Sequence, residues 1–158
     1  MQMAHLPSAE ENLATLGIVL PQPPAPGGNY VSAKRAGQVL YLSGVVSSGP
    51  DGVIKGTVGA DSTVEEGYLA AQACALTQLA VLRRELGSLD QVAEVLTVNG
   101  YVNATAGFPD SPEVINGASD LLVRVFGEAG RHVRAAVGLS ALPRNAMVEV
   151  QMTVRVRD

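Results

Sequence analysis

The stretch from Arg134 to Val156 constrains the fold more than any other part of the chain. Its second half alternates strictly, with one apolar row of Val148, Val150, Met152, Val154 and Val156. The intervening row is polar and consists of Glu149, Gln151, Thr153 and Arg155. A period of two residues predicts a strand with one buried face and one polar face.

A second alternating segment comes just before this strand. Val133, Ala135, Val137 and Leu139 form its apolar row, which leaves Arg134 on the opposite face. The tetrapeptide Leu142-Pro143-Arg144-Asn145 predicts a tight turn between the two segments. We therefore expect two neighbouring strands on which Arg134 and Glu149 each point away from the apolar row of their own strand. Such a pair could bind a small carboxylate and hold a water molecule beside it.

Two long helices are predicted by caps and by the spacing of apolar residues. Ser62/Glu65 and Thr63/Glu66 both have capping-box spacing, and apolar residues then recur at helical period as far as Gly87. The second helix begins at Ser111-Pro112 and ends at Gly127. A Val-rich strand over residues 91–102 separates the helices, and residues 30–44 are typical of a hairpin.

The expected order is β-β-α-β-α-β-β, with a possible short extra strand near residues 53–58. This pattern indicates the α+β class, in which two long helices pack on one face of a mixed sheet. The other face would stay partly open, which favours oligomerisation.

The first 29 residues are expected to form an extension of the domain formed by residues 30–158. Residues 1–7 are predicted to be a mobile leader, and Ser8 begins a short helix that ends at Gly17. Pro21, Pro23, Pro24 and Pro26 then impose an extended segment, because each proline fixes its own φ and restricts the residue before it.

The composition argues against several classes of function. The 158 residues carry 11 basic and 15 acidic side chains, and this net charge of −4 disfavours sequence-independent binding of nucleic acid. The single Cys74 excludes an intrachain disulfide, and it is expected to be a thiol of the core. No apolar run is long enough for a membrane helix and no targeting segment is evident, so a cytoplasmic protein is predicted.

Several polar residues are candidates for chemistry. Arg134 has the planar fork that binds carboxylates through two bonds, although a surface ion pair would also explain it. Glu149 could handle a proton or could be merely solvated. Asn116, Ser43 and Tyr30 each allow a structural reading as well. His132 joins no recognisable metal site or catalytic triad, and no metal is expected.

The arrangement R-x-x-V-x-(x)3-LP-(x)4-V-E-V resembles the C-terminal signature of the RidA/YjgF family of enamine/imine deaminases. Tyr30-Val31, the segment from Leu40 to Gly44, and Asn116 follow the family's order, so the similarity runs from about Tyr30 to Val156. It implies the chorismate-mutase-like (YjgF) fold and a homotrimer with sites between subunits. The resemblance assigns the substrate carboxylate to Arg134, the hydrolytic water to Glu149, and other pocket positions to Tyr30, Ser43, Asn116 and Ala136.

The implied reaction adds water to a 2-imino acid of the 2-aminoacrylate type and gives a 2-keto acid and ammonia. An imine carbon is already electrophilic, so no cofactor is expected, and backbone groups near Ala136 could help to hold the water. The chain departs from the family at Val45, where Gln is common, and at Ala136, where a thiol is common. Two alternatives stay open: an endoribonuclease, which the charge disfavours, and a non-catalytic module that binds small carboxylates.

Overall fold

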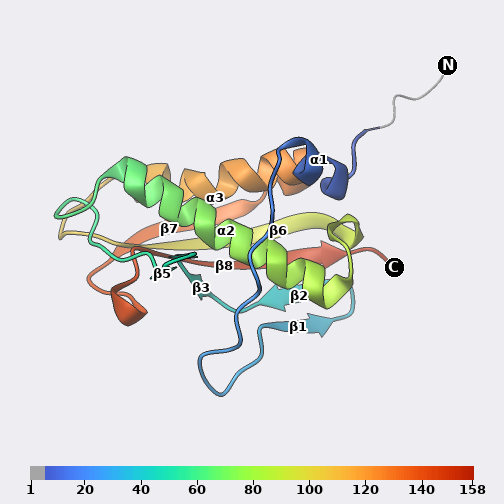
Figure 1. The fold of residues 1–158 in the computed structure, drawn as a ribbon, viewed down its shortest axis with the longest axis horizontal. Coiled ribbons are helices and arrows are strands. Elements are labelled where there is room, and N and C mark those ends of the chain that lie inside the picture. Colours follow the sequence, from blue (N-terminus) through green and yellow to red (C-terminus); the bar gives the residue numbers. More distant parts are fainter. Residues whose placement is uncertain (1–5) are drawn as a thin grey trace.

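A mixed sheet forms the centre of the protein (Figure 1). The computed structural model describes residues 6–158. The strands follow the order β1-β2-β8-β6-β7, and β3 also pairs with β8. Their bounds are β1 Ala33–Ala36, β2 Val39–Leu42, β3 Val45–Val46, β6 Val92–Asn103, β7 Val133–Leu139 and β8 Val148–Val156. A separate two-stranded ribbon joins β4 (Ser48–Gly49) to β5 (Gly52–Val53).

The two long helices, α2 (Val64–Leu86) and α3 (Ser111–Phe126), cover one face of this sheet (Figure 1). Thr63 caps α2 with a complete capping box that includes Glu66, and Gly87 ends the helix at φ 83°. Leu79 of α2, Ile115 of α3 and Met152 of β8 are fully buried in the core between the helices and the sheet. The predicted α+β class and mixed sheet are therefore confirmed.

The N-terminus of α3 differs from its predicted position by one residue. Asp110 is the residue that precedes the helix, and Ser111 is already helical and buried. The region after β2 also differs, because the predicted strand near residues 53–58 is replaced by β3 and the β4–β5 ribbon. Glycines at positive φ, Gly52 and Gly56, bend this segment before a long strand can form.

The predicted pairing of the last two strands is wrong. β6 lies between β7 and β8, parallel to β7 and antiparallel to β8. The reason is the connection through α3, which returns the chain to the sheet parallel to β6 and beyond it, at the edge. The predicted tight turn is present as a short 3-10 helix, Pro143–Asn145. It connects β7 to β8, which lies on the other side of β6.

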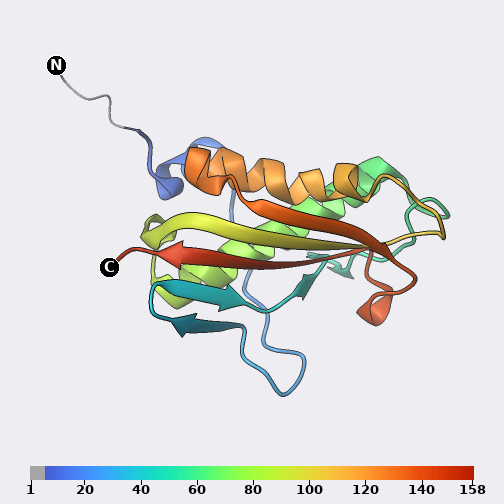
Figure 2. The same ribbon diagram turned by 180° about the vertical axis from the view of Figure 1, so that it is seen from behind.

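The face of β7 that carries the apolar row is also opposite to the one expected. Ala135 pairs with Asn99, which pairs with Gln151, so the apolar row of β7 shares a face with the polar row of β8. We call this the outer face, and in Figure 2 its strands lie in front of α2. Val133, Val137 and Leu139 are 70%, 43% and 39% exposed on it. The outer face is therefore more apolar than the polar row of β8 alone suggested.

The N-terminal segment packs against the rest of the protein. Helix α1 (Ala9–Thr15) has the predicted capping box at Ser8, and Leu13 is buried in the core. Asn12 donates a hydrogen bond to the carbonyl oxygen of Val125, and Glu10 forms an ion pair with Arg83 of α2. Residues 18–29, which we call the strap, then cross α2 and descend to β1 (Figure 1).

The boundary between an extension and a domain at residue 29 stays a prediction, and residues 1–5 of the predicted leader lie outside the described residues. The remaining short elements are the 3-10 helices Leu89–Gln91 and Gly127–Gly130. Within residues 6–158, no helix combines the length and the apolar character needed to cross a bilayer.

Candidate functional site

Arg134 lies on the edge strand β7, on the face that α3 covers. Its Nη1 donates to Asn116 Oδ1 at 2.8 Å and to Ser119 Oγ at 3.1 Å. Its Nη2 lies 3.4 Å from the carbonyl oxygen of Pro112. The side chain is exposed, so α3 fixes the guanidinium without burying it. Asn116 and Arg134, which the sequence analysis assigned to one site, are therefore in direct contact. Ala136 lies two residues further along β7, on the same face as Arg134.

His132 extends this network behind Arg134. Its Nδ1 lies 2.7 Å from the carbonyl oxygen of Gly130, and its Nε2 lies 2.9 Å from Ser119 Oγ. Because a carbonyl oxygen can only accept, Nδ1 carries the proton and Nε2 accepts the hydroxyl hydrogen of Ser119. The Ser119 oxygen is then oriented to accept from Arg134. Burial lowers the pKa of His132, and the nearby Arg134 charge acts in the same direction.

Sequence reasoning did not include Ser119 or His132 in the site. The signals that could have found them are spacing: Ser119 follows Asn116 by one helical turn, and His132 precedes Arg134 by two residues. Neither residue belongs to a recognisable motif, so the spacing alone did not mark them as site residues.

Glu149 lies on the outer face, on β8, between Val46 of β3 and Tyr101 of β6. Its side chain is partly buried, and burial raises the pKa of its carboxyl group. Among residues 6–158, none forms a hydrogen bond or an ion pair with this carboxylate. A methyl group placed on Gly44 would lie 2.7 Å from Glu149 Oε1, so this glycine leaves the space that the carboxylate occupies.

Ser43 and Tyr30 lie in the same neighbourhood as Glu149. Ser43 Oγ donates to the carbonyl oxygen of Val31 at 2.6 Å, and Tyr30 Oη accepts from the amide of Gly27 at 3.1 Å. Gln78 of α2 is fully buried, and its Nε2 donates to the carbonyl oxygens of Ser43 and Val150, both at 2.9 Å. Gln78, which sequence reasoning also missed, thus fixes the break between β2 and β3.

The predicted site residues therefore fall into two groups on opposite faces of one sheet. The first group is Arg134, Asn116 and Ala136, and the second is Glu149, Ser43 and Tyr30. The expectation that Arg134 and Glu149 lie on neighbouring strands is wrong. Their separation is caused by the inserted strand β6 together with the outward-facing apolar row of β7.

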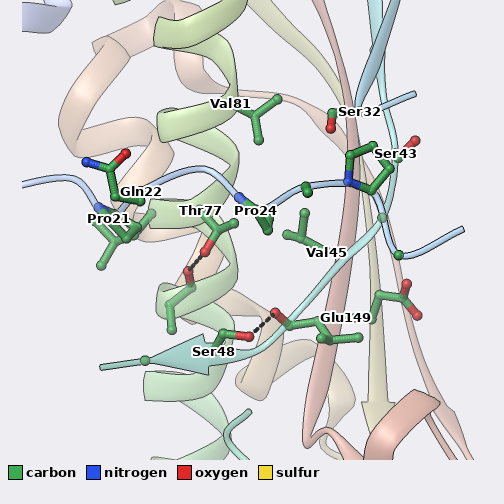
Figure 3. Close-up of a pocket in the computed structure, with 18 of the residues that line it drawn as sticks. Pro21, Gln22, Pro24, Ser32, Ser43, Val45, Ser48, Thr77, Val81 and Glu149 are labelled. Atoms are coloured by element: carbon green, nitrogen blue, oxygen red, sulfur yellow. Dashed lines mark hydrogen bonds between the residues drawn. The ribbon is translucent and has the colours of Figure 1, made fainter. Parts of the chain in front are cut away.

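A large open cavity of about 1400 Å³ adjoins the second group. The strap, α2 and the segment from Ser43 to Pro50 form its walls (Figure 3). Glu149 and Arg144 are the charged residues that line it among those the structure describes. Arg144 belongs to the turn before β8 and has φ 57°. Residues 6–158 contain no group of three His, Cys, Asp or Glu side chains arranged to hold a metal ion.

The fold is that of a protein of the YjgF type, and comparison with known proteins gives the same class. The family model described as "YjgF/chorismate_mutase-like, putative endoribonuclease" matches residues 10–156. The chain belongs to this family.

Similar proteins come from distant organisms. Protein TCP17 of Trypanosoma cruzi is 44% identical over 149 residues, which are 93% of each chain. A solved structure from Agrobacterium tumefaciens, Atu1372, described as of unknown function, is 39% identical with a TM-score of 0.84 and covers 94% of this chain and 91% of its own. One from Shewanella oneidensis, described as a "putative endoribonuclease", is 32% identical with a TM-score of 0.90 and covers 95% of this chain and 100% of its own.

The solved structure of RidA from an Antarctic Psychrobacter is 22% identical with a TM-score of 0.59. It covers 85% of this chain and 94% of its own, and it supports the fold alone.

Proposed function

We propose that the protein is a hydrolytic deaminase of reactive 2-imino acids, with each site built from two copies of the chain. The observation that carries the proposal is the separation of the two groups. Arg134 is held in place by α3 and exposed at a sheet edge, and Glu149 is partly buried without a partner among residues 6–158. Each half lacks what the other half supplies.

A second copy can bring the halves together because of where they lie. β7 is an edge strand, so Arg134 can reach beyond its own sheet. The outer face exposes Tyr41 along with the apolar row of β7, and such a surface favours contact with another protein chain. We expect a homotrimer, in which the outer faces pack around a common axis and each Arg134 approaches the Glu149 of a neighbour.

The chemistry follows from the two groups. The Arg134 fork binds the substrate carboxylate and places the imine carbon near a water molecule. The water oxygen attacks the carbon of the protonated imine, one water proton passes to Glu149, and a carbinolamine forms. Glu149 then returns its proton to the amine nitrogen, and the C–N bond breaks with its electron pair leaving on ammonia. The hydroxyl group releases its proton to solvent as the carbonyl of the 2-keto acid forms. A carboxyl group whose pKa is raised by burial accepts a proton more readily than an exposed carboxyl group does, and it can then return that proton.

The experiment that tests this proposal mixes two inactive variants. Arg134→Ala and Glu149→Gln are each expected to lose hydrolysis of a 2-imino acid generated in situ by an amino-acid oxidase. Mixed trimers refolded from equal amounts should recover activity at about a quarter of their sites, because Arg134 and Glu149 then come from different copies. If Arg134 and Glu149 of the same chain formed each site, mixing the two variants would restore no activity.

Two controls accompany this experiment. Light scattering should give about three times the 16.3 kDa of the chain, and a monomer at micromolar concentration would contradict the shared site. RNA should be incubated with the parent protein in parallel. Cleavage of RNA without imine hydrolysis would favour the endoribonuclease of the family description, and binding of 2-keto acids without either reaction would favour a non-catalytic module.

A further inference from the structure

The cavity beside Glu149, which we call the strap cavity because the strap forms one of its walls, is larger than a small imino acid requires. Pockets for small ligands usually measure about 300–1,000 Å³, whereas this one measures about 1400 Å³. The strap crosses α2, and α1 fixes its beginning through the buried Leu13 and through the pairing of Glu10 with Arg83. The strap thus forms one wall of an open space.

The walls of the strap cavity offer an apolar surface. Figure 3 shows Thr77 and Val81 on α2 and Val45 and Ser43 on the strand segment beside it, with the strap running across from one to the other. Three of the hydroxyl groups in these walls bond to the backbone: Thr77 to Ala73 O, Ser48 to Val46 O and Ser43 to Val31 O. The remaining wall includes prolines, Ala73, Leu76 and Ile54. A polar ligand would find few free partners there.

Among the described residues, the two charged groups that line the cavity come from the turn before β8 and from the start of β8. These are Arg144, in the turn, and Glu149. Ser43 and Gly44 lie at the break between β2 and β3, and both line the cavity beside the Glu149 carboxylate. A molecule whose reacting carbon lies at Glu149 can therefore extend its other end past Ser43 and Gly44, along the cavity and beneath the strap.

We propose that the strap cavity binds the apolar side chain of the substrate, so that the enzyme acts on 2-imino acids with bulky aliphatic or aromatic side chains. This inference rests on the proposed function, because it takes Glu149 as the place of reaction. It specifies the substrate class: imines derived from leucine or phenylalanine are preferred over the imine derived from alanine. Each buried methylene group adds up to about fourfold in affinity.

The test compares hydrolysis of imino acids generated in situ from alanine, leucine and phenylalanine. The parent protein should have kcat/KM at least about 10-fold higher for the leucine-derived imine than for the alanine-derived one. Ala73→Leu adds a side chain to the cavity wall and should abolish this preference while retaining hydrolysis of the small imine. Gln72→Leu places leucine one position earlier, outside the cavity lining, and should keep the preference for the leucine-derived imine.

Titration with pyruvate and 4-methyl-2-oxopentanoate separates this inference from the proposed function. Tighter binding of the larger keto acid, lost in Ala73→Leu, supports the cavity assignment even where no imine is hydrolysed. Equal rates for the small and large imines, unchanged in Ala73→Leu, overturn the assignment and leave the deaminase proposal intact. A change of oligomeric state in Ala73→Leu, seen by light scattering, would mean that a second copy occupies the cavity and would also overturn it.

Discussion

Replacing Gly44 with alanine tests whether the observed position of the Glu149 carboxylate matters for turnover. The added methyl group would lie 2.7 Å from Glu149 Oε1 and 3.3 Å from its Cδ. Carbon and oxygen atoms in ordinary contact lie about 3.4 Å apart or more, so the carboxylate must move by about 0.7 Å. Gly44 has no positive φ, so alanine fits the backbone.

The expected loss follows from this displacement. Catalytic groups have to be held within about 0.5 Å of the productive geometry, and a shift of about 1 Å can reduce the rate by about 10²-fold. We therefore expect kcat for imine hydrolysis to fall by about 10- to 100-fold in Gly44→Ala. Stability should change little, because the atom that must move is the end of a flexible side chain. Reduced freedom of the unfolded chain offsets part of any strain, by about 0.4–1 kcal/mol.

The assay measures steady-state hydrolysis of a 2-imino acid, together with thermal melting and titration with a 2-keto acid. Gly138→Ala is the control, since its methyl group would meet nothing closer than Ser111 Oγ, at 3.4 Å. For Gly44→Ala we expect a lower kcat, a Tm within a few degrees of the parent, and nearly unchanged keto-acid binding, because Arg134 is untouched. Unchanged turnover would refute the role of the observed carboxylate position, and a large drop in Tm would show that Gly44 serves folding instead.

Three further predictions concern the groups of the proposed site. Arg134→Ala should weaken 2-keto acid binding in calorimetry by about 2–4 kcal/mol with little change in Tm, and Arg134→Lys should bind weakly and turn over poorly, because an ammonium group cannot make the paired bonds. Glu149→Gln should lower turnover by about 10²-fold or more and keep keto-acid binding. Burial raises the pKa of Glu149 in the folded protein. The stabilisation that comes from its protonation is therefore fully present below the pKa of the unfolded chain, and it is lost as pH rises through the pKa of the folded protein. Glu149→Gln should therefore melt no lower than the parent at pH 7. His132, with a lowered pKa, acts oppositely: its contribution is present above about pH 6.5 and is lost as pH falls through the folded pKa, so melting scans between pH 8 and 5 should show a smaller decline for His132→Gln.

Much of the fold could be predicted because local signals agreed with one another. The capping box at Thr63, the glycine after α2 and the strict alternation of β8 each fix an element through its own neighbours. Gly100 lies inside β6, where glycine normally weakens a strand, and the structure explains its presence. A methyl group there would lie 2.5 Å from Ile115 of α3, so the glycine lets the helix approach β6 closely.

The faces of the strands could not be predicted in the same way. Alternation in β7 gives two rows, and the apolar row was assigned to the core. The core contact of β7 is instead made by Ala136, on the row that also holds Arg134, and the more apolar row lies on the open outer face. Periodicity shows that the two faces of a strand differ. For a strand at the edge of a sheet, it does not show which of these faces the helices cover.

The arrangement of the site could not be predicted either, because its two halves depend on pairings between residues that are far apart in the sequence. Glu149 is placed by β3 and by the break at Ser43, which Gln78 holds from α2. Arg134 is placed by two residues of α3, Asn116 and Ser119. Two halves fixed so firmly, on opposite faces of one sheet, cannot meet by movement of a side chain. If both act on one substrate, a second copy has to supply one of them, and the apolar row on the outer face of β7 is then needed for assembly rather than for folding.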